Sequence, residues 1–259
     1  MLTQQRRQLI LERLEQDGQI VAKTLATHLN LSEDTIRRDL RELAKEGLLQ
    51  RVHGGALPAS TATADIHARQ NIAADSKQAL ARAASKMIQN GQIVLLDGGT
   101  TTLHLAKCLP KTLQATVVTH SPTIAVELAN HPHVEVVLIG GKLDKHSLVT
   151  VGTAALEALS HIRADLYFMG VTGVHPEAGL STGNLEEAYM KRALSNHAAE
   201  TLVMASEEKL GVASAYMIMP ITEISGLIVN ALDNGADAAA TSVYTSLGVT
   251  VTQVEASQN

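Results

Sequence analysis

Three basic side chains recur at every fourth position in and just after the stretch SEDTIRRDLREL, residues 32–43. Arg37, Arg41 and Lys45 fall on one face of a helix at this spacing, and Arg38 lies beside them. Such a row can bind the phosphates of a nucleic acid, and an arginine can bridge the two acceptors of a guanine edge. The alternative is a solvated helix in which the acids and arginines form ion pairs with one another.

The neighbouring sequence favours the nucleic-acid interpretation. Apolar periodicity predicts one helix over 3–16, a second over 21–30 and a third that begins after Ser32, a good N-cap. The stretch LLQRVHGGAL then predicts a small hairpin that turns at Gly54 and Gly55. Helix, helix, short break, helix and hairpin are the order of a winged helix-turn-helix, whose third helix enters the major groove.

Charge alone does not support this interpretation. The formal net charge of the 259 residues is −5, which argues against a nucleic-acid binder. Residues 1–55 hold nine Lys and Arg against eight Asp and Glu, and the remaining chain holds twelve against eighteen. The arrangement of the basic residues therefore matters more than their number. In the third helix, Ile36, Leu40 and Leu43 would form a buried stripe, which leaves the basic residues on another face.

The pattern changes after a stretch rich in Ala, Ser and Thr that we expect to be a linker. Short apolar runs alternate with Ala-rich helical stretches, which predicts a mostly parallel sheet covered on both faces, an α/β fold. We expect a DNA-binding domain over 1–57, a linker over 58–74 and an α/β domain over 75–259. The expected strands lie at 93–97, 115–119, 134–140, 165–170, 201–205, 226–230 and 249–254.

Residues suited to an anion follow the first of these strands. In IVLLDGGTTT, Gly98 and Gly99 let the backbone approach a ligand, and the next helix would offer free N–H groups. Thr100, Thr101 and Thr102 add hydroxyl groups. The turn lacks the lysine of a Walker loop and the spacing of a dinucleotide fingerprint. A tight turn with a threonine cap and no ligand is the alternative, and the two interpretations have about equal weight.

Other polar residues fall at equivalent strand ends, where ligands of such sheets gather. They are Thr119 and His120 after the second strand, and Gly141 and Lys142 after the third. Farther along, Glu187 and Lys191 lie one helical turn apart. This pair is suited to the hydroxyls or the phosphate of a sugar, but a capping arrangement with an ion pair explains it equally well.

Several classes of protein are not supported. The single cysteine, Cys108, excludes an internal disulfide, and the histidines lack the spacing of a zinc site, so we expect no metal and no cofactor. No signal peptide or membrane span is expected, which predicts a cytoplasmic protein that binds no membrane. No GxSxG elbow accompanies Ser121, so nucleophilic catalysis has little support and no catalytic residue is expected.

These residues together resemble a known family. TIRRDL, LQRVHGGA, LDGGTTT, TVVTH, IGGKL and EAYMKRA occur in the order seen in DeoR/GlpR-type regulators of sugar catabolism. The resemblance covers the chain from about Thr3 to Asn230. It implies a bacterial repressor that binds double-stranded operator DNA as a homodimer or homotetramer and is released by a phosphorylated sugar. It also implies a sensor domain similar in fold to ribose-5-phosphate isomerases and CoA transferases.

The resemblance also implies particular site residues. For DNA they are Thr35, Arg37 and Arg38, and for the effector they are Asp97, Gly99, Thr100, Thr101, Thr102, Gly141, Lys142, Glu187, Lys191 and Lys209. To these we add, from the residue pattern, Ser32, Arg41, Lys45, Arg51 and His53 for DNA and Gly98, Thr119 and His120 for the effector. The chain departs from the family pattern at His120, at Ser206 and Glu208, and at Asn230. A sugar-phosphate isomerase or transferase with a helical appendage is the alternative function.

Overall fold

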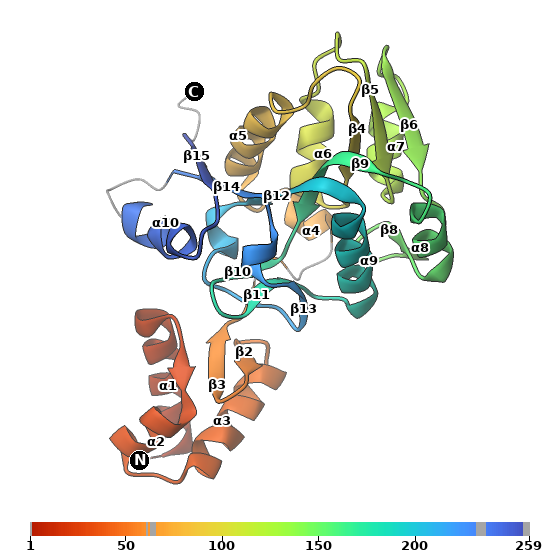
Figure 1. The fold of residues 1–259 in the computed structure, drawn as a ribbon. Helices are drawn as coiled ribbons and strands as arrows, with labels where there is room; N and C mark the ends of the chain where they lie inside the picture. Colours follow the sequence, from red (N-terminus) through yellow and green to blue (C-terminus); the bar gives the residue numbers. More distant parts are fainter. Residues whose placement is uncertain (1, 61, 63–65, 232–236, 256–259) are drawn as a thin grey trace.

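The computed structural model describes residues 2–60, 62, 66–231 and 237–255. Figure 1 shows a small unit built from the start of the chain, in red and orange, and a larger unit built from the remainder. The small unit contains three helices and a three-stranded sheet, and the large unit contains a seven-stranded sheet with helices on both faces. The predicted α/β fold class is confirmed.

The small unit is a winged helix-turn-helix, as predicted. Its elements are α1 (Thr3–Asp17), β1 (Ile20–Val21), α2 (Ala22–Leu29), α3 (Glu33–Lys45), β2 (Leu49–Val52) and β3 (Gly55–Pro58). The hairpin of β2 and β3 is the wing. The sequence does not predict β1, because two residues are too few to show an alternation; β1 pairs antiparallel with β3.

An apolar core and a buried ion pair hold α1 against α3. The predicted stripe of Ile36, Leu40 and Leu43 is buried. The Arg6 guanidinium donates two hydrogen bonds to the Asp39 carboxylate, and Arg6 Nη2 lies 3.1 Å from Asp39 Oδ1. Asp39 is only 1% exposed, so this acid of the TIRRDL motif fixes the orientation of α3 instead of facing solvent.

Described residues of the segment 58–74, which we expect to be a linker, contact the large unit. The Ser60 hydroxyl donates to Thr172 O, and Ile66 N donates to His146 O at 3.2 Å. The segment contains α4 (Ile66–Gln70), and α5 (Ala74–Ser85) begins within it. Small residues make a stretch look like a linker, but they also allow the backbone to lie close against a neighbouring surface.

All seven predicted strands form the large sheet, and every neighbouring pair in it is parallel. The order is β15-β14-β12-β9-β4-β5-β6. These strands are β4 (Ile93–Leu96), β5 (Ala115–Thr119), β6 (Val134–Leu138), β9 (Ala164–Gly170), β12 (Ala198–Ala205), β14 (Gly226–Asn230) and β15 (Val251–Val254). Because the strands are parallel, their carboxyl ends share one edge of the sheet.

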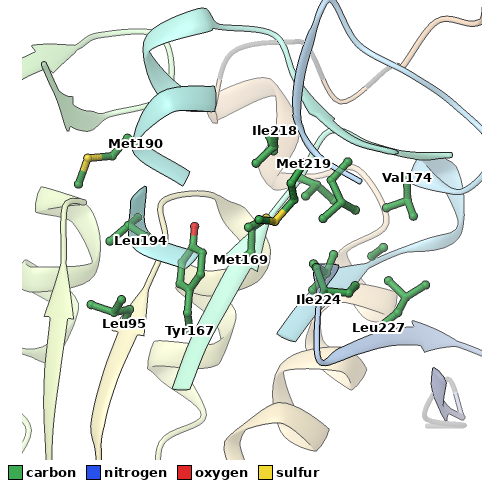
Figure 2. Close-up of a cluster of buried hydrophobic side chains, with 14 of the residues drawn as sticks. Leu95, Tyr167, Met169, Val174, Met190, Leu194, Ile218, Met219, Ile224 and Leu227 are labelled. Carbon is green, nitrogen blue, oxygen red and sulfur yellow. The ribbon is translucent and has the colours of Figure 1, made fainter. Parts of the chain in front are cut away.

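Helices cover both faces of this sheet, because the central strands are apolar on both sides. On one face, α5, α6 (Thr100–Lys107) and α7 (Pro122–Leu128) pack on residues such as Leu96 and Phe168. On the other, α8 (Thr153–Leu159) and α9 (Leu185–Asn196) contribute to a core with residues such as Leu95 and Tyr167, and α10 (Asp237–Ser246) contributes Tyr244 to the same core. Figure 2 shows part of this second core, with Tyr167 and Met169 of β9 and Leu194 of α9.

Two small antiparallel sheets complete the large unit and are not predicted from the sequence. One has the order β10-β11-β13, from β10 (Gly173–His175), β11 (Gly179–Thr182) and β13 (Tyr216–Met219). The other pairs β7 (Lys142–Asp144) with β8 (Val149–Val151). In the described part of the chain no helix is both long enough and apolar enough to span a membrane.

Candidate functional site

The first candidate site is the exposed face of α3. The Ser32 hydroxyl caps the helix by accepting a hydrogen bond from Thr35 N at 3.2 Å. Four basic side chains of the helix are exposed: Arg37, Arg38, Arg41 and Lys45. A helix of 13 residues is about 20 Å long, which suits the major groove.

Some of these cations already have partners on the helix. Arg37 Nη2 lies 2.7 Å from Glu33 Oε1, and Lys45 Nζ lies 2.9 Å from Glu42 Oε1. Exposed pairs of this kind contribute about 0.3–0.5 kcal/mol, so DNA phosphates can replace the acids at little cost. The two other arginines of this face have no ion-pair partner among the described residues.

The wing places two more predicted residues beside this helix. Arg51, in β2, and His53, at the turn of the wing, are both exposed. His53 also borders a cleft whose opposite wall contains His175 and Glu177 of the large unit. The wing is therefore exposed to solvent and also adjoins the large unit.

The second candidate site is a pocket at the carboxyl end of β4, where the chain turns into α6. A Cβ atom at Gly98 would lie 2.1 Å from Val149 Cγ1, and Gly99 has a φ of 128°, so both positions require glycine. The N-terminus of α6 has no side-chain cap, and residues 100–102 line the pocket. Its free N–H groups and the positive end of its dipole form a site for an anion.

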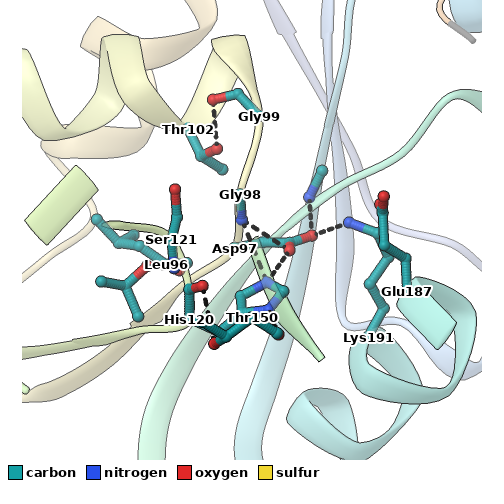
Figure 3. Close-up of polar contacts among 12 residues, drawn as sticks. Leu96, Asp97, Gly98, Gly99, Thr102, His120, Ser121, Thr150, Glu187 and Lys191 are labelled. Atoms are coloured by element: carbon teal, nitrogen blue, oxygen red, sulfur yellow. Dashed lines mark hydrogen bonds and ion pairs between the residues drawn. The ribbon is translucent and has the colours of Figure 1, made fainter. Parts of the chain in front are cut away.

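Asp97 holds the floor of this pocket together (Figure 3). Its carboxylate accepts hydrogen bonds from Gly98 N at 2.8 Å, from Gly170 N at 2.9 Å and from the Lys191 ammonium, and it contacts His120 Nε2 at 2.8 Å. Burial alone would raise the pKa of Asp97, but Lys191 and His120 outweigh it and hold that pKa well below its usual range. The group is a buried, paired carboxylate.

Four cationic side chains from four different elements line the pocket. They are Arg69 of α4, Lys77 of α5, Lys191 of α9 and Lys209 of η2 (Glu207–Lys209). Lys77 Nζ donates to Arg69 O at 2.6 Å, and Lys209 Nζ donates to Thr101 Oγ1 at 3.4 Å. Burial lowers the pKa of Lys209 to about 8; Glu208 opposes this shift, and the neighbouring cations add to it. A bound anion would add negative charge beside these cations and favour their charged forms.

Two carboxylates and several hydroxyls complete the wall. Glu187 accepts a hydrogen bond from Thr182 Oγ1 at 3.4 Å, and Asn184 caps α9 by accepting from Glu187 N at 3.2 Å. The predicted Asn184 cap is present, but among the described residues the predicted ion pair of Glu187 with Lys191 is not, because Lys191 pairs with Asp97. Glu187 lines the pocket as well. The other polar residues of the wall are Ser147, Thr172, Thr182 and Glu208.

The structure brings most of the predicted effector residues to this pocket, but not all of them. Thr119 and His120 lie beneath it: Thr119 Oγ1 donates to Leu96 O at 2.7 Å, and His120 contacts Asp97. Gly141 and Lys142 are exposed, and neither belongs to the pocket wall. Both residues follow a strand end, which predicts a place in the pocket. Lys142 instead lies in β7, which forms a separate hairpin with β8. The described residues include no cluster of three or more potential metal-binding side chains.

Sequence reasoning misses several residues of the wall. The missed residues are Ala62, Arg69, Ile72, Lys77, Ser147, Val149, Val171, Thr172, Thr182 and Glu208. Lys77 gave no clear signal, because it is one of three charged residues of an Ala-rich helix, with Asp75 and Arg82. Arg69 gave none, because it lies in the stretch that composition assigns to a linker.

The fold and the two sites together define a class of protein. A winged helix-turn-helix with a basic recognition face is joined to an α/β domain that carries a cation-lined pocket. This is the organisation of a two-domain transcription regulator.

Comparisons with known proteins give the family. Residues 6–62 match the DeoR-like helix-turn-helix domain, and residues 72–231 match the DeoR C terminal sensor domain. The chain is 37% identical to the HTH-type transcriptional regulator GlpR of Haloferax volcanii over 256 residues, covering 97% of this chain and 98% of GlpR. It is 31% identical to the glycerol-3-phosphate regulon repressor of Escherichia coli K12 over 208 residues, 80% and 82% of the two chains. The chain belongs to the DeoR family of transcriptional regulators.

This membership confirms the predicted resemblance and decides against the alternative of an isomerase-like enzyme, because relatives that match over most of their length are regulators. Ribose 5-phosphate isomerase A from Methanocaldococcus jannaschii is similar at 18% identity with a TM-score of 0.40, over 53% of this chain and 54% of the isomerase.

Proposed function

We propose that this regulator is a repressor of a carbohydrate catabolic operon and that a phosphorylated sugar releases it from operator DNA. One observation carries the proposal: four cations and an uncapped helix N-terminus converge on one pocket of a DNA-binding chain. This is the arrangement that binds a phosphate group. One relative is a repressor named for glycerol 3-phosphate, which supports the same ligand class.

The DNA-binding half of the proposal rests on α3 and the wing. The exposed basic residues of α3, with Thr35, would contact bases and phosphates in the major groove. Arg51 and His53 would contact the adjacent backbone. Paired units, in a homodimer or homotetramer, would read the two halves of an operator. A protein with this role would work in the cytoplasm.

The contacts of the residues that follow the wing support a mechanism by which ligand binding changes DNA binding. Ala213 N donates to Pro58 O at 3.3 Å, at the end of β3, and the Ser60 hydroxyl donates to Thr172 O. Thr172 lines the pocket, and so do Arg69 and other residues of the same segment. A ligand that contacts this wall therefore acts on the residues that hold the wing against the large unit. The ligand changes DNA binding only if its affinity differs between the DNA-bound and the free arrangement of the protein.

A fluorescence-anisotropy titration tests the DNA-binding half of the proposal. Full-length protein is titrated with DNA from upstream of its own gene and with scrambled DNA of equal length, at near-physiological salt. We expect affinity for the native sequence that is higher by a factor of about 10³ or more. Equal and weak affinity for both would overturn the proposal of a specific operator.

Thermal-shift measurements test the ligand half. Sugar phosphates should raise the melting temperature of the protein, whereas the same sugars without phosphate should not. Lys209→Met, which removes a pocket cation but keeps the apolar stem, should lose the response. An equal shift from phosphorylated and unphosphorylated sugars would contradict a phosphate site.

A further inference from the structure

One carboxylate oxygen of the pocket is buried and has no hydrogen-bond partner. Glu208, in η2, accepts a hydrogen bond at Oε1 from the Ser206 hydroxyl at 2.6 Å. Its other oxygen, Oε2, is buried without a partner among the described residues. A buried acceptor of this kind normally has a partner, so its position on the wall of a ligand pocket points to a group on the ligand.

The cations around Glu208 do not provide that partner. The negative charge of Glu208 opposes the lowering of the pKa values of Lys77 and Lys209 that burial causes, so the three groups share one region of the pocket. The hydrogen bonds of the two ammonium groups nevertheless go elsewhere, to Arg69 O and to Thr101 Oγ1. Within the described chain, no ion pair shorter than 4.0 Å joins Glu208 to either lysine. The three groups are neighbours that line the same pocket.

The chemistry of this arrangement is selective. The lysines and the N-terminus of α6 attract a phosphate, whereas an ionised carboxylate only accepts hydrogen bonds. The ligand group next to the phosphate must then be a donor, and a hydroxyl is the donor that sugars and polyols offer. A second anionic group placed there would face the like charge of the half-buried Glu208, which is unfavourable.

We propose that Glu208 determines ligand specificity: it accepts a hydrogen bond from a hydroxyl close to the phosphate and excludes ligands that carry a second anionic group. The effector class is therefore a singly phosphorylated, otherwise uncharged polyol or sugar. Bisphosphates and phosphorylated sugar acids are outside it. This inference rests on the proposed phosphate pocket and names the ligand class of that pocket.

Matched ligand pairs test the inference by calorimetry on the full-length protein. One pair is glycerol 3-phosphate and 3-phosphoglycerate, which differ in a hydroxymethyl group and a carboxylate on the same three-carbon chain. The other is glucose 6-phosphate and 6-phosphogluconate. We expect the protein to prefer the uncharged member of at least one pair by about tenfold or more, since a hydrogen bond to a charged group is among the stronger ones.

Two variants separate the role of the charge from that of the fold. Glu208→Gln keeps the size of the side chain and removes its charge, so the preference should fall at least tenfold. Glu207→Gln removes the exposed neighbouring charge, which lies outside the pocket wall, and should keep the full preference.

The outcomes distinguish the two proposals. If the wild-type protein binds neither member of either pair, the proposed phosphate pocket fails and this inference fails with it. If the protein binds a phosphorylated ligand and Glu208→Gln keeps the wild-type preference, the phosphate pocket stands and the role of Glu208 is refuted.

Discussion

Replacing Asp97 with asparagine removes the charge on which the floor of the pocket depends. The carboxylate is fully buried and faces donors on both oxygens: Gly98 N on Oδ1, and Gly170 N and Lys191 on Oδ2. An amide of the same shape has one oxygen and one NH₂ group. In either orientation the NH₂ group faces a donor, and Lys191 keeps a buried charge without its counter-ion.

The expected loss of unfolding free energy follows from the removal of one partner of a buried ion pair. Removing one member of a buried ion pair costs about 3–5 kcal/mol of unfolding free energy. With a urea m-value of about 2 kcal/mol/M, the midpoint of unfolding of the large unit should fall by about 2 M. The wild-type carboxylate has a lowered pKa, so its contribution is complete above pH 4 or so and is lost only as the pH falls below that range.

Urea denaturation followed by circular dichroism measures this loss, and Asp165→Asn is the matched control. Asp165 is an exposed strand residue that accepts one hydrogen bond, from Ile93 N at 2.8 Å. We expect that control to lose less than about 1 kcal/mol. A loss of the same small size in Asp97→Asn would refute the view that the Asp97 cluster holds the pocket floor.

Three further predictions concern DNA, ligand and pH. Arg37→Ala should weaken operator binding by about 1–3 kcal/mol in an anisotropy titration if Arg37 contacts a base; Arg13→Ala, which also removes an exposed arginine with an i,i+4 acid, should not. Thr101→Val should keep operator affinity but abolish release by the ligand, and release at the unchanged ligand concentration would contradict a role for this hydroxyl. The pKa of Lys209 is lowered to about 8, so the ammonium loses its proton as the pH rises through that value. The ligand's phosphate stays dianionic over this pH range. Calorimetry should therefore find about tenfold weaker ligand binding at pH 9 than at pH 7. Equal affinity at the two pH values would contradict a phosphate contact by Lys209.

The large elements of the fold are predictable from the sequence because their patterns are long. Each of the seven sheet strands is an apolar run between turn residues, and the recognition helix has a strong contrast between its apolar stripe and its basic face. The short strands, such as β7 and β10, have only three residues each, so no alternation can be recognised. They form because tertiary contacts pair them, not because their residues favour strands.

The site is predictable only in part, for a related reason. Motif residues such as Gly99 and Lys191 follow strand ends or helix starts, so sequence order indicates their position. Arg69 and Lys77 reach the pocket from helices before the first strand of the sheet, and no local pattern reveals that approach. Lys142 shows the opposite error, since it follows a predicted strand but is carried away from the pocket by β7.

The most direct test of the central claim measures release of operator DNA by a phosphorylated sugar. A preformed complex of full-length protein and labelled operator is titrated with a sugar phosphate that binds the protein, with the same sugar without phosphate, and with inorganic phosphate. We predict that only the sugar phosphate lowers the anisotropy to that of free DNA, and that Lys209→Met stays bound to the operator throughout. An operator complex that keeps its full anisotropy at saturating sugar phosphate would contradict the account.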